Sequence, residues 1–135
     1  MTGTAPATQG TLQNCRILVA EDEYLIAVEI AETLSDAGAE ALGPVPGVGD
    51  AVCLIAAEGR IDGALLDVNL GGEAIGPVVD ALLARSVPLA LATGYDAGAI
   101  PRAYAHLPRC EKPASGRDLA RALAQVLASR RPDAG

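Results

Sequence analysis

The sequence predicts an α/β domain, built as a doubly wound, five-stranded parallel sheet with helices on both faces. From Cys15 onward, five short apolar runs alternate with longer segments in which apolar residues recur at helical spacing. The runs are apolar on both sides of the strand, which is typical of parallel strands covered on both faces. A chain of 135 residues fits one such domain, with a core large enough to need no disulfide or metal.

The composition limits the classes of function. The chain contains no Phe or Trp and has a formal net charge of −7. A negative protein is not drawn nonspecifically to nucleic acid or to anionic membranes. The three cysteines form neither a CxxC motif nor a disulfide framework. With no signal peptide and no run long enough to span a membrane, we expect a cytoplasmic protein that binds neither nucleic acid nor membrane directly.

Two strand–helix units open the domain. Residues 16–20 (RILVA) predict the first strand, and the helix that follows has apolar residues spaced by four and ends at Gly38. Residues 39–45 predict a weaker second strand. The segment after Gly47 is rich in glycine, so its helix is expected to be less regular.

Two further units follow. Residues 62–68 predict the third strand, and Gly71-Gly72 is interpreted as a strand-to-helix turn rather than a phosphate-binding loop, since no Lys-Ser/Thr pair follows it. Pro77 fits the first turn of the third helix. Residues 87–92 predict the fourth strand.

The last elements are less regular. Pro101 interrupts the segment after the fourth strand, so the fourth helix is expected to be short or irregular. Residues 107–111 predict the fifth strand. Residues 115–118 (SGRD) match a capping box at the start of the final helix.

These elements define the expected boundaries of the domain. We expect a disordered leader over residues 1–14, the folded domain over residues 15–131, and a tail over residues 132–135.

Polar residues that follow the predicted strands should meet at one edge of the sheet. In parallel sheets, ligands bind at the carboxyl ends of the strands. The residues expected there are three carboxylates, one hydroxyl and one ammonium group: Glu21, Asp22, Asp67, Thr93 and Lys112. A single acid after a strand is often only the N-cap of the next helix. The convergence of all five is harder to explain in that way.

This set of groups indicates a chemistry. Carboxylates without histidine or thiolate form an oxygen-only site that suits Mg²⁺. A lysine and a hydroxyl beside the ion would meet the oxygens of a phosphoryl group. Phosphoryl transfer onto a carboxylate needs such groups, because they offset the repulsion between two anions. Asp67, at the centre of the sheet, is the natural acceptor.

The motifs that carry these residues resemble the receiver domain of response regulators in two-component signalling. "ILVAEDE", "ALLDVNL", "LATGY" and "CEKP" occur in the family's order, and the resemblance covers residues 14–130. The chain is most similar to stand-alone receivers whose fourth strand ends in Phe-Ala-Thr-Gly followed by Tyr or a small residue, although Leu91 replaces that Phe. The resemblance implies a flavodoxin-like strand order, 2-1-3-4-5.

The resemblance also implies roles for the site residues. Asp22 and Asp67 would ligate Mg²⁺ directly, and Glu21 would act mainly through water. Asn69 would contribute its backbone carbonyl to the ion. Glu21 stands where an aspartate is commoner, a change that a water-mediated ligand should tolerate.

A switch is implied as well. Thr93 would bond a phosphoryl oxygen and move toward it on activation, and Lys112 would pair with another oxygen. Arg109 stands where most receivers carry an aromatic residue that swings inward, so it is either a departure in the switch or a solvated edge charge. Tyr95 is therefore a candidate for the missing aromatic residue. Phosphorylation would then reorganise residues 94–106 into a partner-binding surface.

The predicted function is that of a single-domain response regulator. Asp67 would be phosphorylated by a sensor histidine kinase or a phosphotransfer protein, and the chain, as a monomer or homodimer, would contact a downstream protein or act as a phosphate sink. It would be no enzyme beyond Mg²⁺-dependent self-phosphorylation and slow self-dephosphorylation. One alternative is a phosphohydrolase, but that enzyme would want an acid where Asn69 stands. Another is a receiver-like interaction module that is never phosphorylated.

Overall fold

The computed structural model describes residues 12–93, 102–111 and 116–130 of the chain. The strands are β1 (Arg16–Ala20), β2 (Glu40–Val45), β3 (Gly63–Asp67), β4 (Leu89–Thr93) and β5 (Arg109–Glu111). The helices are α1 (Tyr24–Asp36), α2 (Val48–Ala57), α3 (Gly76–Ala84) and α4 (Gly116–Arg130), with a short 3-10 helix η1 (Arg102–Tyr104) between β4 and β5. The first strand has the predicted ends, and the ends of the other strands lie within two residues of the predicted ones.

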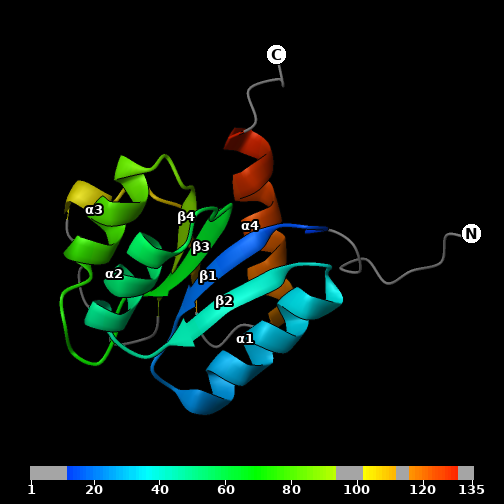
Figure 1. Ribbon diagram of the computed structural model, residues 1–135, viewed down its shortest axis with the longest axis horizontal. Helices are drawn as coiled ribbons and strands as arrows, with labels where there is room; N and C mark the ends of the chain where they lie inside the picture. Colours follow the sequence, from blue (N-terminus) through cyan, green and yellow to red (C-terminus); the bar gives the residue numbers. More distant parts are fainter. Residues whose placement is uncertain (1–11, 94–101, 112–115, 131–135) are drawn as a thin grey trace, which may run out of the picture.

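The strands form one parallel sheet in the order β2-β1-β3-β4-β5. Figure 1 shows α2 and α3 on one face of this sheet and α1 and α4 on the other. The predicted fold class, with its strand order, is confirmed. Part of the predicted fourth helix, over residues 94–101, lies outside the described residues, and the rest contains η1.

The core consists of two layers, one on each face of the sheet. Successive residues of a strand point to opposite faces. In β1, Leu18 and Ala20 pack in the layer with α2 and α3, whereas Ile17 and Val19 pack in the layer with α1 and α4. The same alternation runs through β3 and β4. Burial on both faces explains why these strands appear as continuous apolar runs in the sequence.

Residues 12–14, at the end of the predicted leader, contact the domain. Leu12 is 1% exposed and packs in the layer with α1 and α4. Its N–H donates to the Ala37 carbonyl at 2.9 Å, and the Asn14 N–H donates to the Gly38 carbonyl at 2.9 Å. Burial of one leucine and these backbone hydrogen bonds hold residues 12–14 on the domain. A lone leucine in a polar stretch has no periodicity that would have indicated this.

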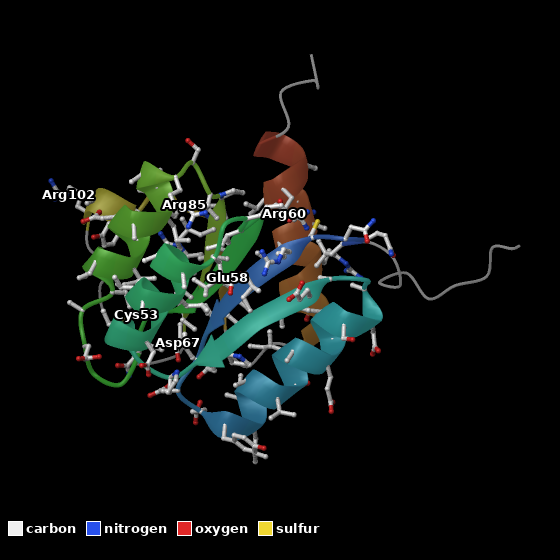
Figure 2. All side chains as sticks on the ribbon, in the orientation of Figure 1. Cys53, Glu58, Arg60, Asp67, Arg85 and Arg102 are labelled. Atoms are coloured by element: carbon white, nitrogen blue, oxygen red, sulfur yellow. The ribbon has the colours of Figure 1, made fainter. Side chains whose placement is uncertain are left out.

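Ion pairs lie where the strands begin, at the edge of the sheet opposite the predicted site. Arg16 Nη2 lies 2.5 Å from Glu58 Oε1, and Arg16 Nε lies 3.3 Å from Glu40 Oε1. The hydrogen bond that Arg16 donates to Glu58 raises the pKa of the Arg16 guanidinium. Arg60 pairs with Asp62 at 3.2 Å; Glu58 and Arg60 are labelled in Figure 2. Each of these three carboxylates is therefore paired with a guanidinium.

The register of the central strands sets the geometry of the opposite edge. Ala20 in β1 pairs with Leu66 in β3. The next residues, Glu21 and Asp67, therefore lie side by side at the ends of neighbouring strands. Asp67 pairs with Ala92 in β4. The sheet therefore brings the ends of β1, β3 and β4 to one place.

Among the helices that the structure describes, none combines the length and apolar character needed to cross a membrane.

Candidate functional site

Three carboxylates meet at the carboxyl edge of the sheet. One oxygen each of Glu21, Asp22 and Asp67 lies within 4.8 Å of the others. Glu21 and Asp67 are buried, at 3% and 5% exposed, whereas Asp22 is exposed. Figure 2 shows Asp67 at the edge toward which the strand arrows point. Two carboxylates of the cluster are therefore buried at the edge of the sheet, and Asp22 is the one that is exposed to solvent.

Backbone N–H groups hold each of these carboxylates. Asn69 N–H donates to Asp67 Oδ1 at 2.9 Å, and Glu23 N–H donates to Glu21 Oε2 at 3.1 Å. In both cases the donor is the residue two positions further on, which at Asp67 is the pattern of an Asx turn. Such donors orient the carboxylates and offset part of their mutual repulsion.

The third carboxylate is held from a distant part of the chain. Gly71 N–H donates to Asp22 Oδ2 at 3.0 Å, across 49 positions of sequence. Gly71 and Gly72 have positive φ angles of 63° and 77°, and Leu70 and Glu73 form a bridge around them. This is a two-residue turn that requires left-handed backbone at both positions, which glycine adopts without strain. The predicted turn is confirmed, but its bond to Asp22 was not foreseen.

The segment between Asp67 and α3 is fixed at further points. Leu70 and Ile75 are buried in the layer with α2 and α3. Glu73 Oε1 accepts a hydrogen bond of 3.3 Å from Val48 N–H. Val48 is the first residue of α2, so its N–H has no acceptor within the helix. The loop that follows the candidate acceptor is thus bound to its surroundings from Asn69 to Ile75.

Thr93 lies beside the carboxylates. It is buried at the end of β4, one residue beyond Ala92, the partner of Asp67 in the sheet. Across the other side, Thr93 pairs with Glu111, the residue before Lys112. Lys112 and Tyr95 themselves lie outside the described residues, so their roles stay predictions, as does the role of the Asn69 carbonyl.

Arg109 makes a specific contact. Its side chain is exposed, and its Nη2 donates to the Ala105 carbonyl at 3.0 Å. The residue that stands in the place of the usual switch aromatic therefore binds the segment of η1. Tyr104, the last residue of η1, is half-buried against the layer of α2 and α3, and no sequence motif marked it in advance.

Solved structures of other proteins are similar to this chain. The solution structure of SdrG from Sphingomonas melonis Fr1 is 37% identical, with a TM-score of 0.74, over 84% of this chain and 97% of that one. A response regulator receiver protein from Sinorhizobium medicae WSM419 is 24% identical, with a TM-score of 0.71, over 88% of this chain and 98% of that one. The response regulator PhyR from Brucella abortus is 22% identical, with a TM-score of 0.76, over 93% of this chain but 53% of its own length.

The last two similarities concern the fold alone. Neither a protein-family model nor a curated protein matches the sequence. A parallel sheet in the order 2-1-3-4-5, with carboxylates gathered at the ends of its central strands, defines a doubly wound α/β domain of the flavodoxin-like type. Together with the similarity to SdrG, this places the chain in a family: it belongs to the receiver domains of response regulators.

Proposed function

We propose that the chain is a response regulator that accepts a phosphoryl group on Asp67 from a sensor histidine kinase or a phosphotransfer protein. The observation that carries this proposal is the position of Asp67, a buried carboxylate at the end of the central strand with oxygens of Glu21 and Asp22 within 4.8 Å. Like charges this close repel, so three carboxylates gathered for stability alone would be costly. A site that binds a cation and a phosphoryl group gives the cluster a purpose.

The carboxylates fit Mg²⁺ as a cofactor. The donors are all oxygens, and Mg²⁺ prefers one or two carboxylates with several retained waters. Asp22 and Asp67 would be the direct ligands, with Glu21 acting through water and Asn69 through its carbonyl. When bound, the ion would neutralise charge on the carboxylates and on the phosphoryl oxygens.

In the transfer step, an oxygen of Asp67 forms a bond to phosphorus. The bond between phosphorus and the donor's imidazole nitrogen breaks, and its electron pair stays on the nitrogen. Asn69 N–H fixes the plane of the Asp67 carboxylate through its bond to Oδ1. Thr93 and Lys112 would each hold one of the oxygens of the transferred group.

The residue two positions beyond Asp67 favours a regulator over a phosphohydrolase. A hydrolase would use a second acid near the acyl phosphate to activate water. Asn69 has an amide there, which cannot take a proton from water. Hydrolysis is therefore slow, and the phosphorylated state persists long enough to signal through a downstream protein or to withdraw phosphoryl groups from a relay.

An apolar surface beside the site supports docking of a partner protein. Tyr24 and Leu25, at the start of α1, are 77% and 79% exposed. They come shortly after Asp22, the exposed carboxylate of the cluster, with only Glu23 between. Exposed large apolar side chains gathered at one place mark contact sites. We assign this contact to the phosphodonor, because its histidine must reach Asp67 from the open side of the cluster.

The proposal is tested by incubation with Mg²⁺ and acetyl phosphate, followed by the intact mass of the protein. We expect one added phosphoryl group in the parent and in the control Glu73→Gln, and none in Asp67→Asn. Consumption of many equivalents of acetyl phosphate would indicate the phosphohydrolase instead. No added mass on the parent would contradict phosphorylation and favour the interaction module.

A further inference from the structure

The hydroxyl group of Tyr104 rests on the bare backbone of Gly76. A Cβ atom on Gly76 would lie 2.9 Å from the Tyr104 hydroxyl oxygen, closer than real Cβ contacts come. Tyr104 ends η1, and Gly76 begins α3. The contact therefore joins the segment before β5 to the helix that follows the candidate acceptor loop.

Gly76 lies at the end of a short, well-anchored path from the site. The path begins at Asp67 and passes through Gly71, whose N–H binds Asp22. It then reaches Ile75, the residue before Gly76, which is buried and whose carbonyl accepts hydrogen bonds from Val78 N–H and Val79 N–H. Because the path is anchored along its length, a shift of the carboxylates is passed to the start of α3 rather than absorbed by a loose loop.

Tyr104 is connected in the other direction to two strands. Its carbonyl accepts from Leu107 N–H at 3.0 Å, and Leu107 is buried. The neighbouring Ala105 carbonyl accepts from Arg109 of β5 at 3.0 Å. The Pro108 carbonyl accepts from Leu91 N–H at 2.8 Å, in the strand that ends at Thr93. η1 is thus attached both to β5 and to the strand that carries the candidate hydroxyl.

From these contacts we infer that Tyr104, seated on Gly76, is a positioning residue that couples the state of the Asp67 loop to the segment of η1. This inference rests on the proposed function, since phosphorylation of Asp67 supplies the change of state. It assigns the role of the switch aromatic residue to Tyr104 instead of Tyr95. Arg109, where receivers usually carry that aromatic residue, serves instead to hold η1 on β5.

A second explanation of Gly76 has to be separated from this one. Gly76 precedes Pro77, and a residue with a Cβ is disfavoured in helical backbone before proline. On this explanation, glycine is needed at position 76 only because Pro77 follows it. The two explanations differ in one respect: only the seat for Tyr104 makes the effect of an added methyl depend on the tyrosine hydroxyl.

A double-mutant cycle on melting temperature makes that distinction. We expect Gly76→Ala to lower Tm by roughly 4 °C in the parent. In the background of Tyr104→Phe, which removes the atom that the methyl would meet, we expect less than half of that loss. Additive effects of the two changes would mean that the glycine serves Pro77, and the seat would be disproved.

Coupling to the site is measured by amide hydrogen exchange across residues 102–109, with and without Mg²⁺ and beryllofluoride. We expect the parent to change its exchange there when the acyl-phosphate mimic binds. Tyr104→Ala should keep acetyl-phosphate labelling of Asp67 and lose more than half of that change, and Tyr104→Phe should keep more of it than Tyr104→Ala. His106→Ala, an exposed change in the same segment, is the control and should behave as the parent does.

The outcomes separate the coupling from the proposed function. If the parent is labelled but residues 102–109 do not respond, or if Tyr104→Ala responds as fully as the parent, the coupling is disproved. If the parent takes no label at all, the proposed function fails, and the cycle on Tm still decides whether Tyr104 is seated on Gly76.

Discussion

Gly71 donates its backbone N–H to Asp22 Oδ2 at 3.0 Å, so the turn after β3 holds a carboxylate that follows β1. Two of the candidate metal ligands therefore depend on the same connection: Asp67 begins it, and Asp22 is bound by it. The turn contributes to the site through its backbone, and its glycines can be tested separately.

Gly71→Ala is expected to weaken Mg²⁺ binding more than Gly72→Ala does. Both glycines have positive φ, so each substitution costs about 1 kcal/mol of stability through backbone strain. Only Gly71 carries the donor to Asp22, so relief of strain at that residue disturbs a ligand. Isothermal titration with Mg²⁺ compares the two variants. Equal loss of affinity would mean that the bond to Asp22 does not position the ligand.

Asp67→Asn is expected to raise the free energy of unfolding in the absence of Mg²⁺, by on the order of 1 kcal/mol, because it removes one of three close carboxylates. It should also abolish the rise in Tm that Mg²⁺ gives the parent. Urea denaturation and thermal melts measure the two effects. Asp80→Asn, an exposed change on α3, serves as the control and should leave both unchanged.

Tyr24→Ser and Leu25→Ser are expected to slow phosphoryl transfer from a histidine-kinase domain that labels the parent, while acetyl phosphate labels the variants as fast as the parent. The two side chains are exposed, so their loss should change stability by less than about 0.5 kcal/mol. Leu83, also exposed but on α3, supplies the matched control Leu83→Ser. If all three variants accept from the kinase at the parent's rate, the start of α1 is not the docking surface.

Lys112→Ala is expected to impair the response to phosphorylation more than Mg²⁺ binding. An ammonium group repels the cation but binds a phosphoryl oxygen, so its removal costs contacts only in the phosphorylated state. Titrations with Mg²⁺ alone and with beryllofluoride measure the two responses. A variant that loses the metal response and keeps the beryllofluoride response would remove Lys112 from its assigned role.

The sequence was sufficient for the sheet and for the meeting of the three carboxylates. β1, β3 and β4 are buried apolar runs, and the acids come where β1 and β3 end, so parallel order alone brings Asp22 and Asp67 to one edge. The apolar runs and the acids after them are local features of the sequence. Only one general rule has to be added, that the carboxyl ends of parallel strands lie at the same edge of the sheet.

The contacts that depend on close approach could not be predicted in this way. The bond from Gly71 to Asp22 joins residues 49 positions apart through a backbone N–H, which has no side-chain signature. The seat of Tyr104 on Gly76 needs the distance between η1 and α3, which no periodicity encodes. Leu12 is buried for the same kind of reason: its partners lie on elements that come later in the chain.

The carboxylate cluster also reports on folding. Glu21 and Asp22 follow β1, Asp67 ends β3 and Thr93 ends β4, so no single strand–helix unit contains the site. A chain in which these central strands have not yet paired has scattered acids and no phosphoacceptor. Acetyl-phosphate labelling of Asp67 should therefore begin only when β1 and β3 have paired. During refolding, the time at which labelling begins would measure when the middle of the sheet forms.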